Sequence, residues 1–183
     1  MAYNFDGDFT VATARDDVYA LLSQTEKFAP LLPSYKSHAI NDDGSSDVEV
    51  KVGVGKIRGT GKVNLVLQES EAPVHAQYVG KGQVMGGAFN ITAAFDLEDA
   101  GEGKTRVKWR GELAMFGKLV SLAGGLVKPV AEKDINAMIA ALQAELGGAE
   151  EAPVAAPPAE ARPPGLFARL LGWLKRLFGG GTK

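Results

Sequence analysis

A long alternation of apolar and polar residues most limits what this chain can fold into. Between Ser34 and Met115, four runs place an apolar side chain at alternate positions, and turns rich in Gly and acidic residues, such as NDDGSSD and DAGEGK, separate them. The apolar positions are Val48, Val50, Val52 and Val54, then Val63, Leu65 and Leu67, then Phe89, Ile91, Ala93, Phe95 and Leu97, then Val107, Trp109, Leu113 and Met115. A period of two is that of a strand with one buried face. We therefore expect an antiparallel meander with its other face in water.

Helical patterns lie on both sides of this region. The opening segment NFDGDFTV alternates as a strand, and ARDDVYALLSQTEKFAPLLP predicts one or two short helices that end at the prolines. A long helix is expected over residues 118–146, with a kink or a late start because Gly124, Gly125 and Pro129 fall inside it. Its apolar stripe is Leu126, Val130, Ile135, Met138, Ile139 and Leu142.

This order of elements predicts an α+β fold in which a curved antiparallel sheet surrounds a long C-terminal helix. Such a sheet and helix form a cup. If its glycines leave room, the cup holds a cavity lined by Val, Leu, Phe and Met. Otherwise the same residues fill an ordinary core, and composition does not separate these alternatives.

Composition divides the chain into a body at 1–146, a linker at 147–165 and a short helix at 166–178. The linker is mostly Ala, Pro, Gly and Glu and holds five of the nine prolines, so we expect it to be extended. Residues 1–161 hold 15 basic and 22 acidic residues, a net charge of −7, whereas residues 162–183 hold five basic residues and no acidic one. This split favours an anionic surface as the partner of the tail and argues against nucleic acid as the main partner.

The tail pattern predicts a membrane-binding helix. Its apolar side chains fall on one arc of about 160° and its basic ones on the opposite arc. A helix of about 20 Å is too short to span a bilayer of about 30 Å, so we expect it to lie in the interface with anionic lipids. A groove on a partner protein or on the body is the alternative site. The predicted membrane-binding residues are Leu166, Phe167, Arg169, Leu170, Leu171, Trp173, Leu174, Lys175, Arg176, Leu177 and Phe178.

Other site chemistry finds little support in the sequence. The chain has no cysteine, and its two histidines, His38 and His75, show no metal-ligand spacing. The glycines of GKGQVMGG precede a strand pattern rather than a helix, which argues against a phosphate loop. We therefore expect no catalytic residue and no metal. The first residues lack the pattern of a secretory signal, and no apolar run is long enough to span a bilayer. We accordingly expect a cytoplasmic protein, peripheral on the inner face of the cell membrane.

The layout resembles the START/Bet v1-like (SRPBCC) helix-grip superfamily and, more closely, the CoxG family of carbon monoxide dehydrogenase subunits. The segment from VEVKVGVGKIRGTGK to GGAFNITAAFDLED carries the resemblance, together with GKLVSLAGGLV and FTVATARDDVYALLSQTEKFAPLLP. These segments lie within residues 1–146. The chain departs from the family at LLPSYK, where a Cys-Leu-Pro-Gly type of turn is common.

The resemblance implies a non-enzymatic adaptor with no intrinsic cofactor. Its cavity would bind a respiratory quinone (menaquinone or ubiquinone) or another lipid, and its partner would be a cytoplasmic molybdenum CO dehydrogenase-type oxidoreductase. Tyr35, Tyr78 and Trp109 could each donate a hydrogen bond to a quinone carbonyl. The candidate ligand-binding residues are Phe28, Leu32, Tyr35, Val52, Leu65, Tyr78, Met85, Phe89, Ile91, Trp109, Met115, Leu119, Leu122, Leu126 and Met138.

Two other functions stay open at this point. A pure membrane tether would have a filled core and no ligand. A polyketide cyclase-like enzyme of the same superfamily would need a polar cluster inside the cup, and the sequence offers few inward-facing acids or histidines.

Overall fold

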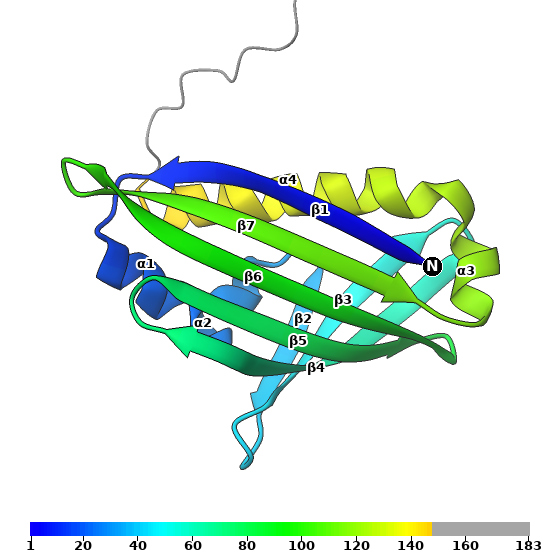
Figure 1. Cartoon of the computed structure of the whole chain (residues 1–183). Helices are drawn as coiled ribbons and strands as arrows, with labels where there is room; N and C mark the ends of the chain where they lie inside the picture. The colour runs from blue at the N-terminus through cyan, green and yellow to red at the C-terminus, as the bar shows by residue number, and fades with distance from the viewer. Residues whose placement is uncertain (148–183) are drawn as a thin grey trace, which may run out of the picture. The chain divides into compact units, whose positions relative to one another are not determined.

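The computed structural model describes residues 1–147, which form a curved sheet and a small set of helices (Figure 1). The elements in chain order are β1 (Ala2–Val11), α1 (Arg15–Leu22), α2 (Thr25–Phe28), η1 (Ala29–Leu31), β2 (Tyr35–Ile40), β3 (Ser46–Val54), β4 (Ile57–Glu71), β5 (His75–Val84), β6 (Gly87–Gly101), β7 (Lys104–Met115), α3 (Lys118–Ala123), η2 (Gly124–Leu126) and α4 (Val127–Glu145). The predicted linker at 147–165 and helix at 166–178 lie outside the described residues, except for Gly147.

The seven strands form one antiparallel sheet in the order β1-β7-β6-β5-β4-β3-β2. From β2 to β7 each strand pairs with its neighbour in sequence, which confirms the predicted meander. β1 pairs with β7, so the first and last strands are adjacent. The sheet curves strongly, and α4 runs along its inner face (Figure 1). The α+β prediction is confirmed.

The inner face of the sheet carries the apolar core in two clusters. The first core cluster joins the sheet to α1, α2 and the C-terminal part of α4. Its buried members are Phe9, Val11, Val18, Leu22, Phe28, Ala29, Val48, Val63, Leu65, Ala76, Tyr78, Phe95, Leu97, Val107, Leu142 and Leu146. The second core cluster lies at the other end of the sheet, around α3, and its buried members are Ile57, Val84, Met115, Leu119 and Val127. Half-buried Phe89 packs against both clusters.

The C-terminal helix is interrupted where its glycines predict it. α3 ends at Ala123, the 3₁₀ segment η2 spans Gly124–Leu126, and α4 begins at Val127. Pro129 falls in the first turn of α4, where a missing backbone N–H costs no helical hydrogen bond. The side chain of Leu126 is 53% exposed and does not share the apolar stripe of α4. Within residues 1–147, no helix is long and apolar enough to cross a bilayer.

The end of α4 is bound to the connection between β1 and α1. Gly147 adopts a left-handed conformation (φ +66°), as a residue just past a helix often does. Its carbonyl accepts a hydrogen bond from the Ala12 N–H at 3.1 Å, and the Leu146 carbonyl accepts one from the Thr13 hydroxyl. These bonds satisfy two carbonyl groups at the helix end and place residue 147 beside the end of β1.

Candidate functional site

Among residues 1–147, no side chain covers one patch of the inner face. Gly111 of β7 lies opposite Ala93 of β6, and Ala93 lies opposite buried Tyr78 of β5. A Cβ atom built on Gly111 would meet only a backbone oxygen, that of Thr92, at 3.8 Å. Ala93 is exposed although it shares its face with Tyr78. We call Ala93 and Gly111 the bare patch.

Most other inner-face glycines are covered. A Cβ on Gly82 would lie 2.2 Å from the ring of Phe89, and one on Gly80 would lie 2.8 Å from Leu65. Gly61, Gly7 and Gly87 are likewise covered by a neighbouring side chain. Glycine at those positions accommodates a protein side chain, whereas at Gly111 it leaves space.

A pocket of about 350 Å³ lies between the sheet and α4 near this patch. Phe5, Trp109 and Ile135 form its apolar lining, and Phe5 pairs directly with Gly111. Its polar rim consists of Asn4, Asp6, Lys128, Glu132 and Asn136. Five of its eight lining residues are polar, so this pocket is mostly polar, and its apolar residues lie beside the bare patch.

The side chains between the two core clusters are only half-buried. Phe89 and Ile91 of β6, Leu113 of β7 and Met138 of α4 are in this class, whereas the buried residues concentrate toward the two ends of the sheet. The middle of the inner face is therefore less filled than its ends. We call this region, with the bare patch and the pocket beside α4, the central hollow.

The structure brings most of the candidate ligand-binding residues onto this inner face. Phe28, Leu32, Tyr35, Leu65, Tyr78, Phe89, Ile91, Trp109 and Met138 belong to or pack against the first core cluster, and Val52, Met115, Leu119 and Leu122 do so with the second. Met85 and Leu126 are 54% and 53% exposed, at the turn between β5 and β6 and in η2. They are not brought together with the others.

The three predicted hydrogen-bond donors differ in what they already bind. The Tyr35 hydroxyl lies 2.8 Å from His38 Nδ1, and the Tyr78 hydroxyl donates to the Leu22 carbonyl at 3.2 Å. Burial raises the pKa of Tyr78 to about 12. Trp109 Nε1 is buried and has no hydrogen-bond partner among residues 1–147. Buried polar groups normally have a partner, so Trp109 is the donor that a ligand with an acceptor group would satisfy.

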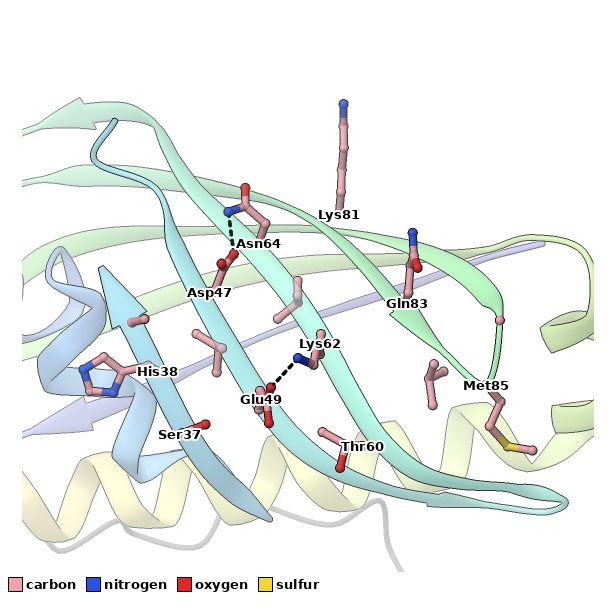
Figure 2. Close-up of a pocket in the computed structure, with 15 residues that line it drawn as sticks. Ser37, His38, Asp47, Glu49, Thr60, Lys62, Asn64, Lys81, Gln83 and Met85 are labelled. Carbon is pink, nitrogen blue, oxygen red and sulfur yellow. Dashed lines mark hydrogen bonds and ion pairs between the residues drawn. The ribbon is translucent and has the colours of Figure 1, made fainter. Parts of the chain in front are cut away.

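A second concavity, of about 620 Å³, lies across β2 to β5 and is lined mainly by polar side chains (Figure 2). Asn64 Nδ2 donates to Asp47 Oδ1 at 2.7 Å, and Lys62 Nζ lies 2.8 Å from Glu49 Oε1. The hydrogen bond from Lys62 lowers the pKa of the Glu49 carboxyl. Since these two pairs already satisfy one another, we take the central hollow as the candidate site.

Sequence reasoning missed Phe5, Ala93, Gly111 and Ile135 as site residues. The apolar alternation could have indicated two of them, because residues 93 and 111 fall on the same face as Phe95 and Trp109. Within residues 1–147, no three His, Cys, Asp or Glu side chains gather closely enough to hold a metal ion.

Comparison with known proteins identifies one family. The model of the CoxG family of carbon monoxide dehydrogenase subunits matches residues 7–147 of this chain. No protein with a curated description gives a significant match.

Solved structures share the fold at low sequence identity. A conserved protein from Geobacillus kaustophilus is 16% identical with a TM-score of 0.70, covering 79% of this chain and 95% of that one. A START superfamily protein from Mycobacterium smegmatis is 16% identical with a TM-score of 0.58 (78% and 96%). The Zhui aromatase/cyclase from Streptomyces sp. R1128 is also 16% identical with a TM-score of 0.58 (80% and 94%). These similarities confirm the predicted helix-grip fold. At this sequence identity they are evidence for the fold and not for a shared function.

Proposed function

The chain belongs to the CoxG family of carbon monoxide dehydrogenase subunits, and from this membership we propose that it carries a hydrophobic ligand for a CO dehydrogenase-type oxidoreductase. The main observation behind this proposal is the bare patch. In a merely structural core, a side chain would be expected to cover Gly111 and Ala93, because protein interiors are close-packed. Here a ligand would cover them.

We propose a respiratory quinone, menaquinone or ubiquinone, as the ligand. Its isoprenoid chain needs an apolar surface, which Phe5, Ile91 and Leu113 offer along the half-buried middle of the inner face. Its ring carbonyl would supply the acceptor that Trp109 Nε1 does not find among residues 1–147. Binding would require a small shift of the indole, because Nε1 is closed to solvent.

The proposed role is carriage rather than catalysis. Around the central hollow, the Tyr35 and Tyr78 hydroxyls are bound to His38 and Leu22, and the charged side chains line the rim of the pocket. Within residues 1–147, the side chains along the middle of the inner face are mainly apolar, which favours carriage over the acid–base chemistry of a cyclase. The predicted tail helix at 166–178 would attach the protein to anionic lipid at the cytoplasmic face of the membrane, where an insoluble quinone is found.

Organic extraction followed by mass spectrometry tests this proposal. Purified full-length protein and protein truncated after Gly148 are compared, because both contain the central hollow and only the first contains the tail. We expect a quinone in both samples at similar occupancy. A truncated protein without ligand, beside full-length protein with mixed membrane lipids, would instead support a pure tether.

A further inference from the structure

The antiparallel topology collects several connections at one end of the sheet. The turn between β3 and β4, the turn between β5 and β6, and the segment from β7 into α4 all lie at the end that holds Met1. In Figure 1 the N-terminus, α3 and the turn from β5 to β6 lie together at this end. We call residues 53–58, 84–88 and 115–128 the tip end.

Every charged side chain of the tip end is basic. Lys56, Arg58, Lys118 and Lys128 are all exposed, and these three segments contain no Asp or Glu. Lys128 Nζ lies 3.8 Å from Glu132 Oε1, in the next turn of α4. The ion pairs formed within residues 1–147 do not involve Lys56, Arg58 or Lys118. The tip end is thus a positive surface on a body whose net charge is negative.

Large apolar side chains are exposed at the same end. Met85, Phe116 and Leu126 are 54%, 48% and 53% exposed. The Phe116 N–H donates to the Ala88 carbonyl at 3.0 Å, which places Phe116 beside the connection that carries Met85. The Arg58 N–H donates to Met85 Sδ at 3.2 Å. Ile40 and Val66 are exposed to a similar degree but lie elsewhere, on β2 and β4.

The opposite end of the sheet is acidic. Its turns connect β2 to β3, β4 to β5, and β6 to β7, and their acidic residues are Asp42, Asp43, Glu69, Glu71, Asp99 and Glu102. Lys104 pairs with Glu102 at 3.4 Å, and His75 Nε2 lies 3.6 Å from Glu69 Oε2. The body therefore has a charge asymmetry along its strands, and a negatively charged surface would attract its tip end and repel the other.

We propose that the tip end is a second membrane-contact surface, distinct from the tail. Met85, Phe116 and Leu126 enter the interface of an anionic bilayer, and the four basic side chains lie among the headgroups. These apolar side chains lie on separate connections and do not line one groove. The interface of a bilayer can take them up without a surface of complementary shape. Anionic lipids also supply the charge complement. This surface goes beyond the proposed function, in which the tail alone attaches the protein.

The tail and the tip end can reach the same bilayer. The described fold ends at Gly147, beside Ala12 and thus at the end opposite Met1. β4, with 15 residues, spans about 50 Å at about 3.3 Å per residue. The predicted linker, residues 147–165, would span about 60 Å if extended at about 3.1 Å per residue. It is long enough to follow the length of the sheet.

Vesicle binding by the full-length protein tests the proposal. The probes are vesicles of phosphatidylcholine with and without phosphatidylglycerol. The variant carries Met85→Asp with Phe116→Asp, and the matched control carries Ile40→Asp with Val66→Asp, which replaces equally exposed apolar residues elsewhere. We expect the first pair to weaken binding to anionic vesicles by about tenfold or more and the control pair to leave it unchanged.

A site-specific probe covers the case in which the double variant is unstable. The chain has no cysteine, so Met85→Cys or Ile40→Cys accepts a single environment-sensitive fluorophore. We expect the emission at position 85 to rise and shift to the blue with anionic vesicles, and emission at position 40 to stay constant. An unresponsive probe at position 85, with full binding through the tail, would overturn the proposal. So would a probe that responds only to the purified oxidoreductase, because the tip end would then be a protein-docking surface.

Discussion

Tyr78 shows how a single buried residue is committed to the fold. Its ring packs edge-to-face against Phe28 with centroids 5.3 Å apart, and its hydroxyl donates to the Leu22 carbonyl. Burial raises the pKa of this hydroxyl to about 12. The residue therefore ties β5 to the end of α1 in its neutral form and is not free to donate to a ligand.

Alkaline unfolding tests the role of Tyr78. Because its pKa is raised on folding, its contribution to stability is complete below about pH 10 and is lost as the pH rises through about 12, by about 2–3 kcal/mol. Urea unfolding between these pH values should show a loss that is larger in the wild type than in Tyr78→Phe by this amount. Both proteins share the remaining loss, because the hydrogen bond with Glu49 raises the pKa of Lys62, which also titrates in this range. Tyr3→Phe removes an exposed hydroxyl from a half-buried residue of β1 and should behave as the wild type. An equal loss in Tyr78→Phe would contradict the assignment.

Two inner-face glycines should respond oppositely to the same change. Gly82→Ala places a Cβ 2.2 Å from the Phe89 ring, and the forced shift should cost about 1–3 kcal/mol. Gly111→Ala meets no side chain and should be neutral, or stabilising by up to about 1 kcal/mol, because Ala loses less backbone entropy. Equilibrium chemical denaturation measures both. If Gly111→Ala were as destabilising as Gly82→Ala, the bare patch would be covered in solution.

At the scale of elements, the alternation over Val48–Val54 and over Phe89–Leu97 is enough to predict strands and the face that each buries. Odd-numbered and even-numbered residues of a strand lie on opposite faces, so the apolar positions identify the buried face. Gly124 and Gly125 likewise predict the break before α4. The uncovered state of Ala93 and Gly111 could not be predicted, because it depends on strand register and on the placement of α4. The sequence pattern groups Leu126 and Met85 with buried residues, whereas the structure exposes both. Each lies in a connection, where the apolar periodicity of the neighbouring helix or strand no longer applies.

The end of α4 should depend on Thr13. Its hydroxyl donates to the Leu146 carbonyl, and its own carbonyl accepts a bond from the Thr105 hydroxyl at 2.7 Å. We expect Thr13→Ala to lower the free energy of unfolding by about 1 kcal/mol and Thr13→Ser to keep most of it. Thermal and denaturant unfolding of the two variants measure the difference. Equal stability of both would mean that water replaces this hydroxyl at no cost.

At the scale of the whole molecule, the described fold separates three properties along its strands. One end is acidic, the other is basic and apolar, and the central hollow lies between them. This arrangement suits a carrier that takes its ligand from a bilayer. The surface that contacts the lipid and the site that binds the ligand are then parts of the same sheet. The proposed CO dehydrogenase-type partner would receive the ligand away from the membrane.

Trp109 allows the most direct test of the central claim, that the hollow takes a quinone. The chain has two tryptophans, Trp109 and Trp173, so Trp173→Phe in the full-length protein leaves one fluorophore beside the hollow. A short-chain menaquinone is titrated against an isoprenoid alcohol that lacks the ring, because a quinone ring in contact with indole quenches its emission. The account predicts saturable quenching by the quinone and little change with the alcohol. Trp109 emission that does not change when the quinone is added would contradict the central claim.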